Sequence, residues 1–248
     1  MIKLEREGDV FVLKMVEGEN RWTTTFVRAF DEALDEVEAS MGAAALVTAS
    51  ENEKFFSNGL DLEWLSTKGE HRGGDRSVFG AEAMTLFGRM ITLPVPTVCA
   101  VNGHAFGAGF MIALCHDLRI MREDRGYVCA NEVELGMSIP EPELALFRHK
   151  MPLDAFFQTV QLARRWNGPD ALAAGIVQEV VDKDSVISAS VEKAQSLAHL
   201  ATNRENFGWM KEHIYGENAA INGPHGAAYM LRNQSMYAHG PARAPARS

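Results

Sequence analysis

The stretch Asn102–Phe110 reads NGHAFGAGF and lies between the apolar run TVCAV (97–101) and the apolar segment MIALC (111–115). The first run favours a buried strand, and the segment after the glycines favours a helix. A strand that enters a helix through small residues leaves backbone N–H groups free at the positive end of the helix dipole. The turn therefore suits an anion or an oxyanion that develops during a reaction.

Other interpretations of this turn fit less well. A dinucleotide-binding turn needs the order G-x-G-x-x-G and an acidic residue about 20 positions later, whereas the order here is G-x-x-x-G-x-G. A nucleophile elbow needs G-x-S-x-G, and no serine or cysteine occupies the turn. A turn whose glycines only let helix and sheet approach closely stays open as the structural alternative.

Composition and charge limit the class of protein. The chain has 248 residues with 46% apolar content, enough for one α/β domain or a domain with an appendage. Its formal charge of −9 argues against nucleic acid and anionic membranes as partners. No apolar run approaches the roughly 20 residues of a membrane span, and the N-terminal MIKLEREGD lacks a signal-peptide pattern. We expect a soluble, unexported, cytoplasmic protein.

The cysteines and histidines indicate neither disulfides nor a metal site. Cys99, Cys115 and Cys129 are odd in number and lie in apolar contexts, which suits reduced core thiols in a reducing compartment. His104 and the neighbouring pair Cys115 and His116 are the candidate ligands, but adjacent residues at a helix end diverge and no second His/Cys pair completes four-coordination. The sequence predicts no bound metal.

The order of apolar patterns predicts an α/β protein with parallel strand pairing and right-handed crossovers. We expect an α/β core over 1–183, a C-terminal helical part over 184–248, and a disordered tail from His239 onward. The expected strands are 2–7, 10–16, 44–50, 97–101, 118–121, 127–130 and 176–182. The expected helices are 25–39, 78–92, a segment ending at Leu114, 142–150, 153–165, 169–175, 184–200, 203–216 and 224–238.

Two further stretches join the glycine turn in a recognisable order. KFFSNGLDL (54–62) follows the strand AALVTAS, and NEVELG (131–136) follows the predicted strand 127–130. Together with Ala100–Gly109 and Asp117, these segments resemble the crotonase superfamily, also called the enoyl-CoA hydratase/isomerase family. The resemblance extends from about residue 2 to 200, and three spaced motifs in order make it specific.

The resemblance implies a crotonase-type spiral of ββα units with a helical C-terminal trimerisation part, present as a homotrimer or a dimer of trimers. It also implies an acyl-CoA substrate and stabilisation of an enolate, with coenzyme A as part of the substrate and no separate cofactor. The backbone N–H groups of Leu60 and Ala108 match the family's oxyanion donors. Residues expected to touch substrate are Ser57, Asn58, Gly59, Asp61, Gly107 and Pro140.

Glu132 matches one of the two glutamates of the family's hydratases, and a carboxylate in an apolar pocket makes a suitable base. The other position, 111, carries methionine, which argues against efficient hydration. The segment from Gly136 to Pro142 resembles the single-glutamate Δ3,Δ2-enoyl-CoA isomerases of the peroxisomal plant type. Isomerisation of the double bond is therefore the leading prediction, with a hydratase and a catalytically idle acyl-CoA-binding subunit as alternatives.

The remaining charged residues receive weaker assignments. Arg21, Lys54 and Lys211 are candidates for holding the coenzyme A phosphates. Asp61 and Asp117 are expected to be structural. Glu134 should alternate with Glu132 along a strand and face away, while Glu141 and Glu143 are expected to be solvated, with a smaller chance that one assists. The polar segment 66–77 is expected to be a mobile loop beside the acyl pocket.

Overall fold

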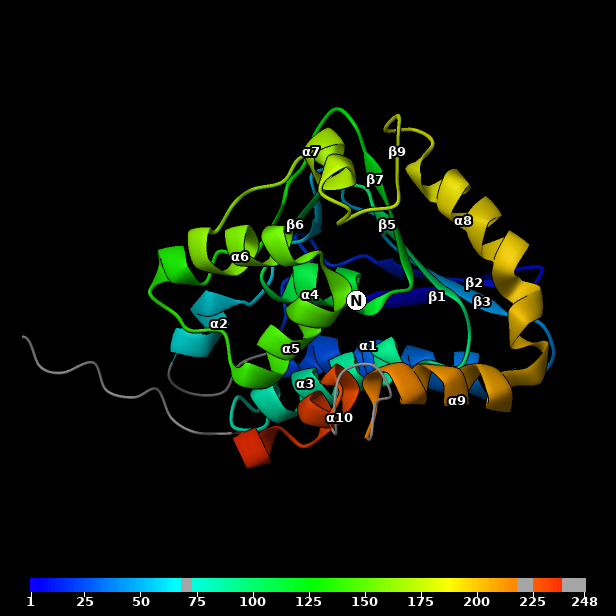
Figure 1. Cartoon of the computed structure of the whole chain (residues 1–248), viewed down its shortest axis with the longest axis horizontal. Helices are drawn as coiled ribbons and strands as arrows, with labels where there is room; N and C mark the ends of the chain where they lie inside the picture. The colour runs from blue at the N-terminus through cyan, green and yellow to red at the C-terminus, as the bar shows by residue number, and fades with distance from the viewer. Residues whose placement is uncertain (68–72, 218–224, 238–248) are drawn as a thin grey trace, which may run out of the picture.

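In the computed structural model, which describes residues 1–67, 73–217 and 225–237, two sheets lie among ten helices of varied length (Figure 1). The larger sheet has the order β1-β2-β3-β5-β7-β9, and the smaller has the order β4-β6-β8. The strands are β1 Ile2–Glu7, β2 Val10–Met15, β3 Ala45–Ser50, β4 Phe55–Ser57, β5 Thr97–Val101, β6 His104–Phe106, β7 Leu118–Arg122, β8 Val128–Cys129 and β9 Glu179–Val181.

The helices cover both faces of the larger sheet and form the C-terminal part. They are α1 Thr24–Ala39, α2 Leu62–Ser66, α3 Phe79–Ile91, α4 Ala108–Cys115, α5 Glu141–Lys150, α6 Leu153–Leu162, α7 Gly168–Ala173, α8 Val186–Leu197, α9 Arg204–Tyr215 and α10 Ala227–Arg232. Three short 3-10 helices, η1 Val133–Leu135, η2 Ala198–Asn203 and η3 Gln234–Tyr237, complete the described elements.

The strand pairing confirms the predicted α/β architecture. β1 and β2 form the expected antiparallel hairpin, and β2, β3, β5, β7 and β9 pair in parallel. The central parallel strands are buried and mostly apolar because both faces of the sheet are covered. β3 and β5, for example, are buried along their whole length.

Two separate apolar clusters fill the two sides of the larger sheet. On one side, α1, α3 and α4 cover a large core that contains Trp22, Phe26 and Phe30. On the other side, Val186, Ala194 and Ala198, from α8 and the residue that follows it, cover the outward-facing residues of β2, β3, β5 and β7. The helix at residues 184–200 that the sequence predicts is therefore part of the core packing of the sheet.

The smaller sheet is the main feature that the sequence analysis did not predict. β6 lies inside the stretch that was interpreted as a continuous turn, and it pairs in parallel with β4 and β8. β4 and β6 have three residues each and are flanked by glycine or polar residues, so no periodicity marks them. β8 lies within the predicted strand 127–130. The segment 131–136 also differs from prediction, because it forms the 3-10 helix η1 and not a strand.

Two predictions of disorder fall in part or in full on residues outside the described part of the chain. These are the expected loop at 66–77, of which 68–72 are not described, and the expected disordered tail from His239 onward. The three cysteines are free and buried, as predicted.

Candidate active site

The turns that follow β4 and β6 touch each other. A methyl group placed on Gly59 would lie 2.5 Å from the carbonyl oxygen of Phe106 and 3.5 Å from the backbone nitrogen of Ala108. Gly59 and Gly107 have positive φ angles of 75° and 49°, a conformation that residues with a side chain rarely adopt. Glycine at these two positions therefore lets the Leu60 loop approach the N-terminus of α4.

Gly109 allows the close approach of α4 to the end of β4. A methyl group on Gly109 would lie 2.6 Å from the carbonyl oxygen of Ser57. The buried Ser57 hydroxyl donates to the carbonyl oxygen of Asn20 (2.8 Å) and accepts from the indole N–H of Trp22 (3.0 Å). β4 is thus held against α4 on one side and against the loop before α1 on the other.

Neither backbone N–H of Leu60 or Ala108 donates a hydrogen bond to any residue that the structure describes. The neighbours of Leu60 are engaged, since the carbonyl oxygen of Gly59 accepts from Trp22 (2.8 Å) and Asp61 N–H donates to the Trp22 carbonyl (3.1 Å). Ala108 is the first residue of α4, where backbone N–H groups lack an intrahelical acceptor. Both donors are available to an external acceptor.

Glu132 places a carboxyl group beside this turn. A methyl group on Gly107 would lie 3.2 Å from Glu132 Oε1. The Glu132 side chain is 9% exposed, and its Oε2 is buried without a hydrogen-bond partner among the described residues. Burial raises the pKa of Glu132 above the ordinary value of 4.5. A buried carboxylate without a cation beside it is well suited to accept a proton.

A cavity of about 190 Å³ lies over the two turns. Several residues predicted to meet substrate line it, while Ser57, Asp61 and Pro140 do not. Ser57 is fully buried and holds β4, Asp61 caps α2 by accepting from Trp64 N–H (2.9 Å), and Pro140 precedes α5. The lining residues are Arg21, Asn58, Gly59, Leu60, Leu62, Gly107, Asn131, Glu132, Leu135 and Met137.

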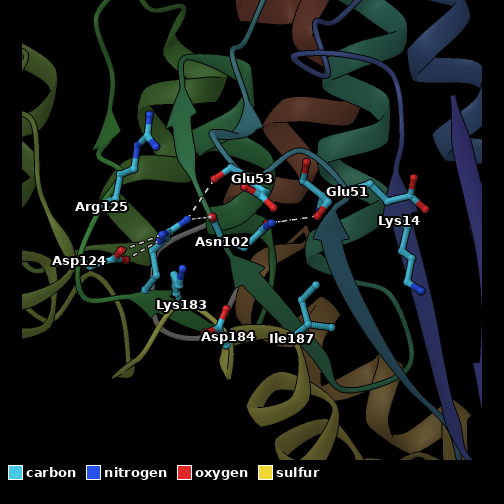
Figure 2. Close-up of a pocket in the computed structure, with 11 residues that line it drawn as sticks. Lys14, Glu51, Glu53, Asn102, Asp124, Arg125, Lys183, Asp184 and Ile187 are labelled. Atoms are coloured by element: carbon cyan, nitrogen blue, oxygen red, sulfur yellow. Dashed lines mark hydrogen bonds and ion pairs between the residues drawn. The ribbon is translucent and has the colours of Figure 1, made fainter.

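A larger cavity of about 590 Å³ lies elsewhere, where strands of the larger sheet end near the start of α8 (Figure 2). Four of its eight charged residues, Lys14, Glu51, Arg122 and Asp124, form ion pairs within the protein. Arg122 pairs with Asp124 (2.7 Å) and donates to the carbonyl oxygens of Glu53 and Asn102. The Asn102 side chain donates to the carbonyl oxygen of Ser50 (2.9 Å). Size alone would favour this cavity, but it lacks the free backbone donors and the buried carboxyl group of the smaller one.

The three candidate cations differ in availability. Arg21 is exposed, lines the smaller cavity and pairs with Glu19 (2.8 Å), and Lys54 is exposed beside the Phe55 ring. The assignment of Lys211 is wrong, because Lys211 is 5% exposed and its ammonium group is bound to Asp117 (2.8 Å).

Asp117 has the structural role that the sequence analysis predicted. Its carboxylate accepts from the backbone N–H and hydroxyl of Thr97 (2.8 and 3.0 Å) as well as from Lys211. Glu134 is exposed and pairs with Arg165 (3.1 Å), so it faces away from Glu132 as expected, although from a 3-10 helix.

Glu143 differs from the prediction of a solvated residue. Glu141 is exposed as expected, but Glu143 is partly buried on α5. Burial, and then the negative charge of Glu132, raises the pKa of Glu143 to about 8. Since α5 begins at Glu141, the helical face occupied by Leu146 and Phe147 was the available signal for its orientation.

Within the described ranges, no three His, Cys, Asp or Glu side chains are grouped so as to hold a metal ion. No described helix is both long enough and apolar enough to cross a membrane.

Comparison with known proteins places this geometry in context. The family model described as enoyl-CoA hydratase/isomerase matches residues 5–239. An Arabidopsis thaliana protein named enoyl-CoA delta isomerase 2, peroxisomal, is 31% identical over 229 residues, which cover 90% of this chain and 95% of that protein. Enoyl-CoA delta isomerase 3 of the same plant is 29% identical and covers 88% and 93%.

Solved structures share the fold. A probable enoyl-CoA hydratase from Mycobacterium tuberculosis has a TM-score of 0.77 at 26% identity, covering 94% of this chain and 92% of that chain. A structure described as an enoyl-CoA isomerase from the same bacterium has a TM-score of 0.76 at 25% identity, covering 93% and 96%. Both structures are of the same bacterial protein, which is named once for hydration and once for isomerisation.

Proposed function

This chain belongs to the enoyl-CoA hydratase/isomerase family of enzymes, and on that premise we propose that it moves the double bond of a 3-enoyl-CoA to the 2-position. The observation that carries the proposal is the buried carboxyl of Glu132 beside two touching turns, each with one free backbone N–H group. The Arabidopsis relatives named delta isomerases support it.

The first step is removal of a proton from C2 of the thioester by the Glu132 carboxylate. The electrons of the C2–H bond move toward the thioester carbonyl, and its oxygen gains negative charge. The N–H groups of Leu60 and Ala108 would donate to this oxygen, and the N-terminus of α4 adds a favourable dipole. A proton returned to C4 completes the shift of the double bond from C3–C4 to C2–C3.

The residue at position 111 favours this reaction over hydration. Met111 is 3% exposed in α4, so no carboxylate at this position is present to orient a water molecule. The hydratase remains the second candidate, because Glu143 supplies a further carboxyl group near Glu132. An idle acyl-CoA-binding subunit is the third, and it predicts binding without turnover.

Two incubations separate these functions. With a 3-enoyl-CoA the isomerase forms a conjugated thioester, so the characteristic absorbance appears; with a 2-enoyl-CoA the hydratase removes it. We expect Glu132→Gln to lower kcat by about 10²–10⁴-fold, because it removes the base. Glu134→Gln is the matched control, since Glu134 is two residues away, exposed and paired with Arg165. Wild-type turnover by Glu132→Gln would refute the assigned base.

We also propose that the acyl-CoA phosphates approach Arg21, which is exposed and lines the cavity, and Lys54, which is exposed just before β4. The homotrimer or dimer of trimers stays a prediction of the family resemblance. α9 presents Trp209 and Met210 to solvent, 56% and 49% exposed, which supports an additional contact there. Light scattering during gel filtration measures the assembly directly.

A further inference from the structure

Helix α5 presents a second carboxyl group on the face that packs against α4. Leu146 and Phe147 of α5 are fully buried, and the Phe147 ring lies 5.7 Å from the Phe110 ring of α4. Residues four apart on a helix share a face. Glu143 therefore lies on the same face as Phe147, one turn closer to the N-terminus of α5.

The two helices run in the same direction, which brings Glu143 toward the glycine turn. Lys150, at the C-terminal end of α5, lies within electrostatic range of Cys115 and Asp117, at the C-terminal end of α4. One turn back from Phe147 is Glu143, and one turn back from Phe110 is Gly107. The same turn of α4 adjoins Glu132, so Glu143 and Glu132 approach the N-terminus of α4 from different elements.

Glu132 and Glu143 form a pair that cannot easily carry two negative charges. Neither carboxyl has an ion pair or a side-chain hydrogen bond with another described residue. Burial raises both pKa values, and the charge on Glu132 raises that of Glu143 further, to about 8. When two carboxyls interact in this way, one holds the proton and can act as acid while the other is ionised and can act as base.

We propose that Glu143 is the acid partner of Glu132 in the isomerisation: Glu132 accepts the proton from C2, and the carboxylic acid of Glu143 donates a different proton to C4. The C2–H bond breaks and the C4–H bond forms, so the double bond moves and the substrate gains no net proton. Glu132 ends protonated and Glu143 ionised, and exchange with solvent restores both. This inference rests on the proposed isomerase function.

The groups around Glu143 indicate that Glu132 and Glu143 determine how kcat/KM depends on pH. The elements packed on α5 are α4, α6, α10 and η3, and the charge that acts on Glu143 is that of Glu132. The kcat/KM profile should therefore rise as Glu132 ionises and fall above a pH of about 8 as Glu143 loses its proton. The titratable groups on these elements and on α5 itself are Cys115, Asp154, Tyr229, Arg232, Tyr237, Glu141, Arg148, His149 and Lys150.

Isotope transfer tests whether Glu132 and Glu143 act as separate base and acid. With a 3-enoyl-CoA deuterated at C2, a single shuttle carries deuterium from C2 to C4, whereas two separate carboxyls place a solvent hydrogen at C4. We expect solvent hydrogen at C4 in the wild-type product, measured by mass spectrometry. Glu143→Gln should lower kcat by about 10²-fold and restore deuterium transfer, because only Glu132 remains. Glu141→Gln is the matched control, exposed and two residues away.

A measurement that needs no substrate turnover tests the acid role of Glu143 separately from the proposed isomerase function. Infrared difference spectroscopy at pH 7 should show a protonated carboxyl band in the wild type that Glu143→Gln removes and Glu141→Gln leaves. Absence of that band, or deuterium transfer from C2 to C4 by the wild type, would overturn the acid role of Glu143. A wild type that shows the band but does not isomerise any 3-enoyl-CoA would refute the isomerase proposal instead. Gln is close in shape to the protonated carboxyl, so the variant should fold.

Discussion

The substitution Gly109→Ala should disable the site while leaving its carboxyl groups in place. The added methyl would lie 2.6 Å from the carbonyl oxygen of Ser57, and ordinary contact begins at 3.4 Å, so β4 and α4 must separate by about 0.8 Å. Because the Ser57 hydroxyl accepts from Gly59 N–H (3.3 Å), the shift passes to the Leu60 donor. A misplacement of roughly 1 Å can cost about 10²-fold, similar to the loss of one oxyanion donor.

Leu60→Ala provides the contrast. It shortens a side chain at the same loop but keeps the backbone N–H, so we expect kcat within about 3-fold of wild type, against a fall of about 10²-fold for Gly109→Ala. Both rates are measured from the appearance of the conjugated thioester. The reasoning fails if Gly109→Ala retains wild-type kcat, or if Leu60→Ala loses as much.

Loss of stability needs its own control, because overpacking costs about 1–3 kcal/mol. Gly88→Ala places a methyl 2.9 Å from Arg232 Cγ and 3.2 Å from the carbonyl oxygen of Ala228, at the contact between α3 and α10. It should lower Tm and leave kcat unchanged. Assays well below the Tm of each variant then separate displacement of the donors from unfolding.

Three further outcomes follow from buried charges. Burial raises the pKa of Glu132, so the acid limb of the kcat/KM profile should lie above pH 4.5. The control variant Glu212→Gln should leave the position of that limb unchanged. Asp117→Asn leaves the buried Lys211 ammonium without its charged partner and should lower the free energy of unfolding by about 3–5 kcal/mol, whereas Glu212→Gln at an exposed pair should cost about 1 kcal/mol or less; denaturant titration compares them. Burial lowers the pKa of His116 to about 3, so the unfolded chain binds a proton first as the pH falls below about 6.5. Stability should therefore drop by about 2 kcal/mol between pH 7 and pH 5, and His116→Gln should flatten that dependence.

Much of the large sheet could be predicted because its strands are long enough to carry a pattern. β3 and β5 are buried and mostly apolar, Gly42 lies shortly before β3, and Pro96 and Gly103 flank β5. The positions of Leu60, Ala108 and Glu132 came from spaced motifs and not from periodicity. Their proximity arises from pairing of β4 with β6, strands too short to be recognised in the sequence.

The charged residues show where sequence reasoning ends. Lys211 could not be distinguished from an exposed cation, because its contact with Asp117 joins residues 94 positions apart. Glu143 was treated as solvated because it flanks Pro142, yet its exposure depends on how α5 packs on α4. The cytoplasmic location stays a prediction, and two of the Arabidopsis relatives are named peroxisomal.

The cover that α8 gives to the sheet affects how the chain must be made. The strands beneath it are complete by Arg122, but α8 begins at Val186, about 60 residues later. At about 5–20 residues per second on the ribosome, one apolar face of the nascent sheet stays exposed for roughly 3 to 12 s. Val12, Val47 and Val98 then wait for their cover, so this interval is the one in which a chaperone would most improve the yield of native protein.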